Sequence, residues 1–162
     1  MTIPDEHRKP LGLCLSAGGA LGFAHIGALE ALLENGIEPD IISGCSMGAI
    51  VGAFYAAGMS PKDMIKVIEA DKLYKVSKLM VLNPYFWKTG FSNHAAVKEV
   101  IHEIIPHNSF EKLQRRLFIG VTNLNTMECE IISSGNRLAE WVSASASIPG
   151  VFETFEDNGN YY

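Results

Sequence analysis

The segment from Gly44 to Gly48 constrains the fold of this chain more than any other, because it places a serine between two glycines at the end of an apolar run. It reads Gly-Cys-Ser-Met-Gly, a G-x-S-x-G pattern. Residues 40–43 before it contain two isoleucines, and residues 49–57 after it are good helix formers. The sequence therefore predicts a buried strand, a tight turn and a helix, which together form the setting of a nucleophile elbow with Ser46 as the candidate nucleophile.

The two glycines are expected to support this turn. Gly44 and Gly48 leave room for the strand and the helix to pass closely, while a strained backbone at Ser46 lifts its hydroxyl out of the fold. The helix also points its amide-rich N-terminus at Ser46, where partial positive charge favours a developing oxyanion. We expect Cys45 to turn inward as a small buried thiol. The alternative is a chance G-x-S-x-G in an ordinary strand-to-helix turn.

A second small-residue loop, residues 16–22, separates a predicted buried strand at 11–15 from a predicted helix with Ile26, Leu29 and Leu33 on one face. The backbone amides of such a loop suit an anion. A dinucleotide pyrophosphate would require G-x-G-x-x-G, but Ala17 replaces the first glycine and no acidic residue follows the second strand at the ribose position. The other candidate is the oxyanion of an acyl-transfer intermediate, held by the amides of three residues: Gly18, Gly19 and Ala20. A simple tight turn is the third interpretation.

Composition bounds the class of protein. With 162 residues, 48% of them hydrophobic, the chain can bury a substantial core as one domain. A formal net charge of -5 and 13 scattered Lys and Arg residues argue against a nucleic-acid partner. Cys14, Cys45 and Cys129 form no C-x-x-C pair, so neither a disulfide framework nor a zinc site is expected, and a reducing compartment fits.

The amino terminus does not have the layout of a secretory signal, because charged residues precede a glycine-interrupted apolar run. The longest uncharged stretch, Ile41 to Met59, has glycines and small polar residues around the G-x-S-x-G pattern. It is therefore interpreted as strand, turn and helix, not as a membrane span. These observations predict a soluble, cytoplasmic protein.

The rest of the chain continues to alternate helices and strands. Ser60 is the expected N-cap of a helix with Pro61 in its first turn. The aromatic-rich stretch 72–92 is interpreted as a covering segment, with a lipid gate as the alternative. The remaining predicted elements are helices at 93–105 and 138–147, strands at 117–121 and 129–132, and a hairpin with arms at 151–155 and 160–162 around Asn158-Gly159.

The run LCLSAGGALGFAHIGALEALLENGIEPDIISGCSMGAIVGAFYAAGMS resembles the amino-terminal half of the patatin-like phospholipase family. LFIGVTNLNTMECEI and SASASIPGVF extend the resemblance over residues 11–162, after a lead-in at 1–10. The resemblance implies a three-layer α/β fold whose mixed, mostly parallel sheet is flanked by helices. It also implies a serine acyl hydrolase of phospholipase A or lysophospholipase type that acts on lipid esters without metal or organic cofactor and with peripheral membrane contact.

Carried over by position, the resemblance makes Ser46 the nucleophile. In the family a G-G-G-x-R/K-G loop supplies the oxyanion hole, and Gly18, Gly19 and Gly22 match that loop. This chain departs from the pattern at Ala17, which replaces a glycine, and at Leu21, which replaces the usual basic residue.

The family's general base is an aspartate in a D-G-G or D-G-A motif a few residues beyond the last hairpin, and this sequence contains neither motif. The expectation is a patatin-like domain at 11–162 that is truncated before a Ser-Asp dyad is complete. Asp157 precedes Asn158-Gly159, where an aspartate ordinarily accepts local backbone hydrogen bonds, so it is interpreted as a turn residue.

Two other functions stay open. A Ser-His-acid esterase would need a base after Ser46 in the chain and an acid between them. The available groups are His94, His102 and His107 with Asp63 and Asp71. His25 is expected to pack or cap its helix. The third possibility is a non-catalytic scaffold or binding fragment with the same fold.

Overall fold

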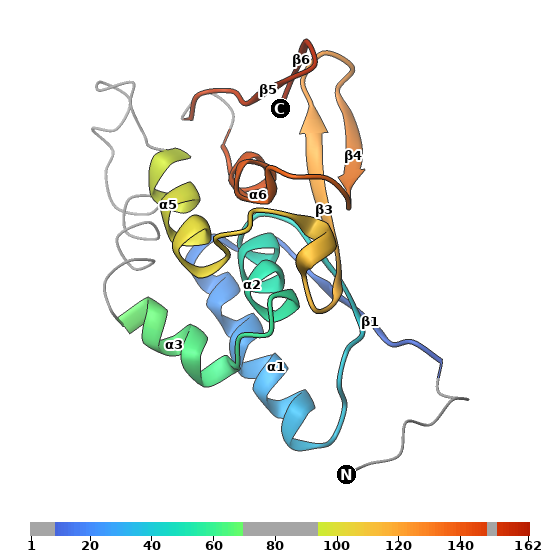
Figure 1. Ribbon diagram of the computed structural model, residues 1–162, viewed down its shortest axis with the longest axis vertical. Coiled ribbons are helices and arrows are strands. Elements are labelled where there is room, and N and C mark those ends of the chain that lie inside the picture. Colours follow the sequence, from blue (N-terminus) through green and yellow to red (C-terminus); the bar gives the residue numbers. More distant parts are fainter. Residues whose placement is uncertain (1–8, 70–93, 149–151) are drawn as a thin grey trace.

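The computed structural model describes residues 9–69, 94–148 and 152–162 (Figure 1). The predicted covering segment at 72–92 lies outside the described residues. So do most of the lead-in and part of the expected first arm of the hairpin.

A four-stranded mixed sheet organises the domain. It contains β1 (Gly12–Leu15), β2 (Ile41–Gly44), β3 (Arg116–Asn123) and β4 (Glu128–Ile132) in that spatial order. The first three strands are parallel and β4 runs antiparallel to β3. Leu15 is in register with Gly44, and Gly44 with Ile119, so β1 and β2 end together at one edge of the sheet. The predicted mixed, mostly parallel sheet is confirmed.

The helices follow the predicted pattern. Figure 1 shows α2 at the centre of the molecule, and all ten of its residues are buried. Ser60 caps α3 as expected, because its Oγ accepts a 3.2 Å hydrogen bond from the Asp63 amide. The α-helices are α1 (Ala24–Glu34), α2 (Met47–Ala56), α3 (Pro61–Glu69), α5 (His94–Ile104) and α6 (Leu138–Ser145), and the 3₁₀ helices are η1 (Gly19–Phe23) and η3 (Phe110–Lys112).

The two faces of the sheet have different surroundings. A Cβ built at Gly52 in α2 would lie within 3.7 Å of side-chain atoms of Ile42, Leu117 and Leu15, so α2 packs on the face that these residues share. Residues that alternate with them point to the opposite face, where a cavity of about 430 Å³ is lined by Ser43, Phe118 and Ile131 among others.

All three cysteines line this cavity and are exposed. The expectation that Cys45 would be a buried thiol is wrong. The turn was expected to expose Ser46 and to point the preceding residue inward, but the described residues leave this face of the sheet open.

The C-terminal hairpin is shorter than predicted. Its paired strands are β5 (Glu156–Asp157) and β6 (Asn160–Tyr161), so the first arm begins later than the expected 151–155. Phe155 and Tyr162 extend the pairing through mutual backbone hydrogen bonds of 3.0 and 2.8 Å. Both rings meet Trp141 of α6 edge-on, at centroid distances of 4.9 and 5.0 Å. This aromatic cluster anchors the hairpin to α6.

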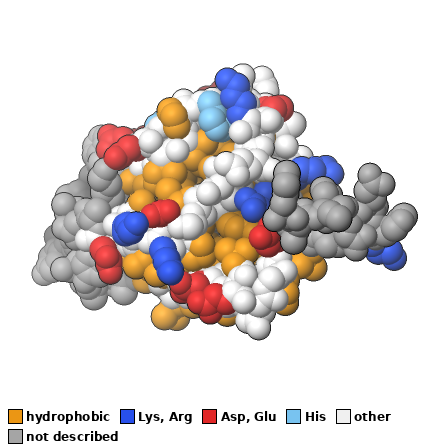
Figure 2. Space-filling model, turned by 60° about the horizontal axis from the view of Figure 1, so that its bottom comes forward, with side chains coloured by type: hydrophobic (Ala, Val, Ile, Leu, Met, Phe, Trp, Pro, Cys, Tyr) orange, Lys and Arg blue, Asp and Glu red, His pale blue; other side chains and the backbone are white. Residues whose placement is uncertain are grey.

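One face of the molecule mixes charges of both signs. On the face shown in Figure 2, Lys and Arg side chains lie among Asp and Glu side chains, with hydrophobic side chains exposed between them. Over the described part of the chain, every helix falls short of the length and apolarity that a membrane crossing requires.

Candidate active site

Ser46 occupies the tight turn between β2 and α2. Its backbone has φ 55° and ψ −121°, a conformation that typically costs a side-chain-bearing residue about 1–3 kcal/mol. The turn closes with a 2.9 Å hydrogen bond from the Gly48 amide to the Cys45 carbonyl, and α2 begins with the Ala49 amide bonded to the Ser46 carbonyl at 2.9 Å. Ser46 therefore sits at the N-terminus of a buried helix, where the first amides are directed toward it.

The glycines around this turn are required by close backbone contacts. A Cβ at Gly48 would lie 2.2 Å from the carbonyl oxygen of Leu15, and one at Gly44 would lie 2.3 Å from that of Gly48. A Cβ at Gly22 would lie 2.6 Å from the Met47 side chain. A side chain at Gly44 would force β2 and α2 apart, and one at Gly48 or Gly22 would separate α2 from β1 or η1, so the glycines bring the loop after β1 against the Ser46 turn.

The loop after β1 runs directly into η1. Gly18 has an extended φ of 177°, Gly19 has a left-handed φ of 50°, and the Leu21 amide bonds the Gly18 carbonyl at 3.0 Å. The amides of Gly19 and Ala20 are at the start of η1, where a helix leaves its amides without internal acceptors. Ala17 is not one of the five described non-glycine residues with positive φ, so an alanine fits there without strain.

His25 fixes the start of this loop. Its Nε2 lies 2.9 Å from the Ser16 carbonyl oxygen, and because a carbonyl only accepts, Nε2 carries the hydrogen. The expectation that His25 packs or caps its helix missed this contact, since His25 reaches back from α1 to the residue after β1. Leu21 in the same loop is 85% exposed.

Two further residues, one at the Ser46 turn and one at the C-terminal hairpin, had no signal in the sequence. The Ser46 amide donates to Ser145 Oγ at 2.9 Å, although the two residues are 99 positions apart. Arg137 precedes α6 with a left-handed φ of 80°. A contact between residues so far apart leaves no periodic pattern in the sequence, and neither does an arginine with a left-handed backbone.

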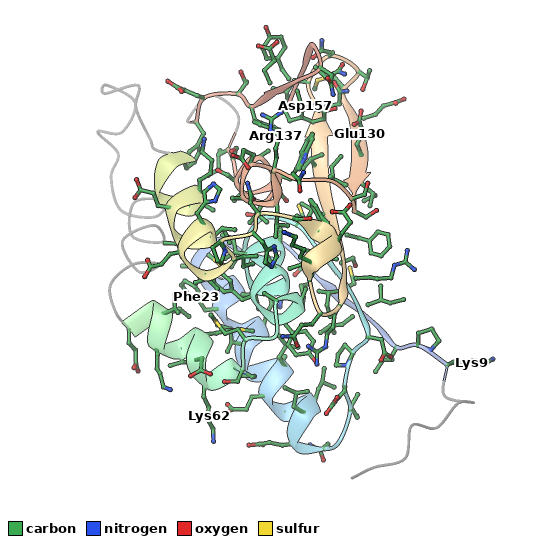
Figure 3. The ribbon with its side chains drawn as sticks, viewed as in Figure 1. Lys9, Phe23, Lys62, Glu130, Arg137 and Asp157 are labelled. Atoms are coloured by element: carbon green, nitrogen blue, oxygen red, sulfur yellow. The ribbon has the colours of Figure 1, made fainter. Side chains whose placement is uncertain are left out.

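The Asp157 carboxylate is hydrogen-bonded to two neighbouring side chains. Figure 3 shows Arg137 and Asp157 close together at the hairpin, and Arg137 Nη1 donates to Asp157 Oδ1. Asn158 Nδ2 donates to the other carboxylate oxygen at 2.9 Å. The Arg137 guanidinium also lies over the Phe155 ring, 4.5 Å from its centroid. Both carboxylate oxygens therefore have structural partners.

Three of the side chains considered for a Ser-His-acid arrangement make contacts with residues other than Ser46. His102 Nε2 lies 3.9 Å from Glu140 Oε1, and His107 Nδ1 accepts a 3.3 Å hydrogen bond from the Ser109 amide. Asp63 is hydrogen-bonded to Lys66 and Ser60, each at 2.7 Å, and the bond from Lys66 chiefly lowers the pKa of its carboxyl. Within the described residues, none of these three is hydrogen-bonded to Ser46.

Two groups of that set, Asp71 and the His94 side chain, lie outside the described residues. Over the ranges that are described, His, Cys, Asp and Glu side chains form no group of three suited to a metal ion.

Comparison with known proteins identifies relatives along almost the whole chain. Residues 13–162 match the family model described as patatin-like phospholipase. The chain is 30% identical over 156 residues to the lysophospholipase NTE1 of Yarrowia lipolytica and covers 11% of that protein. It is 31% identical to the lysophospholipase NTE1 of Candida glabrata, with 9% of that protein covered, and 94% of this chain is aligned in both cases. The chain thus spans about a tenth of the length of these relatives.

Two solved structures share the fold. VipD from Legionella pneumophila superposes with a TM-score of 0.63 at 19% identity, over 95% of this chain and 45% of that one. The type III effector protein ExoU gives 0.61 at 17% identity, over 88% and 41%.

Proposed function

The chain belongs to the patatin-like phospholipase family, and from this membership we propose that it is a serine hydrolase of lipid carboxylic esters that works through an acyl-enzyme on Ser46. The single observation that carries the proposal is the Ser46 turn. A serine with positive φ is held between glycines at the N-terminus of a buried helix, beside a glycine loop that has amides at the start of η1.

The proposed chemistry uses the hydroxyl of Ser46. No described residue is hydrogen-bonded to this hydroxyl. The oxygen attacks the ester carbonyl carbon, its proton passes to a base, and the carbonyl oxygen becomes an oxyanion. The amides of Gly18, Gly19 and Ala20 stabilise that charge. Collapse expels the alcohol, which takes up a proton, and water then hydrolyses the acyl-serine to release the fatty acid and restore Ser46.

We assign the base to an aspartate of the D-G-G or D-G-A type, as the family pattern implies, so that Ser46 works in a Ser-Asp dyad. Asp157 is not that base in this proposal, because Arg137 and Asn158 bind its carboxylate.

The proposed substrates are phospholipid or lysophospholipid esters, and the contact with their membrane is peripheral. Leu21, 85% exposed in the loop next to Ser46, offers an apolar side chain to such a surface. The three cysteines are free thiols, which fits a reducing compartment such as the cytoplasm.

The test is covalent labelling with a fluorophosphonate, which phosphonylates an activated serine, followed by mass spectrometry of the modified peptide. The probe is applied to the 162-residue chain and to a form extended through a D-G-G or D-G-A motif, with hydrolysis of a short acyl ester and of a lysophospholipid measured in parallel. We expect modification at Ser46 in the extended form and loss of turnover in Ser46→Ala. Cys45→Ser is the matched control, because it changes the neighbouring exposed thiol and should retain turnover.

Three outcomes contradict parts of the proposal. Full turnover by Ser46→Ala removes this serine from the mechanism. A His→Ala variant that abolishes acylation replaces the dyad with a Ser-His-acid esterase. A folded extended protein that neither labels nor hydrolyses any ester is a non-catalytic scaffold or binding protein.

A further inference from the structure

Ser145, the last residue of α6, connects the Ser46 turn to the neighbouring strand β3. Its Oγ accepts a 2.9 Å hydrogen bond from the Ser46 amide and donates a 2.7 Å hydrogen bond to the Gly120 carbonyl. Both contacts are partly buried. One hydroxyl therefore links three elements that are distant in sequence.

The direction of this link is fixed by its two partners. A carbonyl oxygen only accepts, so the Ser145 hydrogen points at Gly120 and its lone pairs face the Ser46 amide. That amide belongs to the residue with φ 55°, where the chain has left the β2 ladder and α2 has not yet begun. On either side, the Cys45 amide bonds the Leu15 carbonyl and the Gly48 amide bonds the Cys45 carbonyl. Ser145 thus completes the hydrogen bonding of the turn at the strained residue itself.

Ser147, two residues beyond the end of α6, makes a different hydrogen bond. Ser147 Oγ donates to the Ser143 carbonyl four residues earlier, the ordinary local bond of a helical serine. At Ser145 the hydroxyl instead reaches out of its helix, to β3 and to the Ser46 turn. A local helical role does not account for this geometry.

We propose that Ser145 is a positioning residue for the nucleophile: it holds the Ser46 backbone in its positive-φ conformation and so keeps the Ser46 hydroxyl aimed at the ester. The effect of Ser145 on catalysis rests on the proposed function, whereas its hydrogen bond to the Ser46 amide does not. In the reaction Ser145 acts through the backbone of Ser46. Because the Ser46 amide already donates its hydrogen bond to Ser145, the oxyanion must be stabilised by other amides, among them those of the glycine loop.

The test compares Ser145→Ala, which removes the hydroxyl, with Ser145→Thr, which keeps it and adds a methyl group beside the cavity. Ser109→Ala is the matched control. Ser109 is 4% exposed and its hydroxyl also makes a 2.7 Å hydrogen bond, but to Glu111 after α5. Loss of a hydroxyl with a partly buried hydrogen bond is therefore common to both alanine variants, and loss of the contact to Ser46 is specific to Ser145→Ala.

The first readout is amide hydrogen exchange at Ser46, measured by NMR, which requires no enzymatic activity. Ser145→Ala should speed exchange of the Ser46 amide by about tenfold or more, because the hydrogen bond that protects it is gone. Exchange at Ile119 in β3 should change little. Ser145→Thr should restore protection, and Ser109→Ala should leave the Ser46 amide as protected as in the parent chain.

The second readout is the rate of Ser46 phosphonylation together with kcat and KM for a short acyl ester, in the extended form. Ser145→Ala should lower kcat and the labelling rate by about tenfold while KM changes by less than about twofold, since misplacement of the nucleophile acts on the chemical step. Ser145→Thr should recover most of that loss.

The two proposals fail in different ways. An unchanged exchange rate at Ser46 in Ser145→Ala overturns the positioning role, whatever the activity. Equal losses of turnover and stability in Ser145→Ala and Ser109→Ala also overturn it, because the effect is then general destabilisation. Amide exchange at Ser46 could instead rise in Ser145→Ala while no form of the protein reacts with the fluorophosphonate or hydrolyses an ester. In that case Ser145 does position the Ser46 backbone, and the proposed hydrolase function is wrong.

Discussion

The turns that carry Ser46 and Asp157 hold their polar residues in opposite ways. At Ser46 both backbone polar groups are hydrogen-bonded, the amide to Ser145 and the carbonyl to amides of α2. No described residue is hydrogen-bonded to the Ser46 hydroxyl. At Asp157 the side chain is bound, with Arg137 on one carboxylate oxygen and Asn158 on the other. The Ser46 side chain is thus positioned through hydrogen bonds to its backbone, whereas the Asp157 side chain makes the structural hydrogen bonds itself.

The strongest test of this comparison is Gly48→Ala. The added Cβ would lie 2.2 Å from the Leu15 carbonyl oxygen, and a backbone atom cannot rotate away. We expect the free energy of unfolding to fall by at least about 3 kcal/mol, as for severe overpacking, and activity to disappear with the turn. Urea denaturation followed by circular dichroism measures the change.

Gly27→Ala is the control for Gly48→Ala. Gly27 lies inside α1 with nothing within 4 Å of a built Cβ, so alanine should stabilise the protein by about 0.5–1 kcal/mol. Similar unfolding midpoints for the two variants would show that the close backbone contact at the Ser46 turn is not required.

Gly19→Val tests whether the glycine loop acts on the transition state. There is space for a side chain at Gly19, but its φ of 50° suits a β-branched residue poorly, so the loop should shift and misplace its amides. Loss of one oxyanion donor lowers kcat by about a hundredfold or more. Steady-state kinetics on a short acyl ester would show this as a fall in kcat. A rise in KM alone would make the loop a substrate contact.

His25→Phe tests the contact that anchors the loop after β1. The phenyl ring keeps the bulk of the imidazole but cannot donate to the Ser16 carbonyl, 2.9 Å from Nε2 in the parent chain. We expect kcat to fall by about tenfold, the scale of one lost hydrogen bond that orients a catalytic group. His25→Gln retains a donor and should recover part of the rate. Equal activity in the phenylalanine variant would show that the loop holds its shape without His25.

Asp157→Asn should have the smallest effect. The ion pair with Arg137 is partly exposed, so its loss should cost about 1 kcal/mol or less of stability, visible as a small shift in the urea midpoint. Ester turnover should be unchanged, whereas removal of a general base would lower it by about 10²–10⁴. A loss on that scale in a folded Asp157→Asn protein would reverse the comparison between the two turns.

Much of the fold was predictable because the relevant signals are local. The apolar run before Gly44 and the helix formers after Gly48 predicted β2 and α2 within about two residues, and Ser60 predicted the start of α3. The G-x-S-x-G pattern also located the turn with the strained serine, since only glycine fits the close backbone contacts on both sides of it.

The contacts that complete the site were not predictable in this way. Ser145 meets Ser46 only after β3 and α6 have been placed, and His25 meets Ser16 only after the chain turns through η1. Cys45 was assigned to the interior because the turn was expected to expose Ser46 and to point the preceding residue inward, whereas its thiol is exposed and lines the cavity. Asn158-Gly159 predicted the hairpin turn next to Asp157, but the described contacts of its carboxylate come from the side chains of Arg137 and Asn158 and not from the expected local backbone amides. Arg137 also adopts a left-handed conformation that no propensity favours.

The contact of Gly48 with the Leu15 carbonyl also has a consequence for folding and heat inactivation. It joins the first strand to the helix that follows the second, so the Ser46 geometry exists only in a chain whose β1 has paired with β2 and whose α2 has docked. During refolding, reactivity of the serine should therefore return at the docking of α2, later than the recovery of helical circular dichroism. On heating, inactivation should follow the same curve as loss of the sheet, which would make turnover of a chromogenic ester a direct measure of the folded fraction.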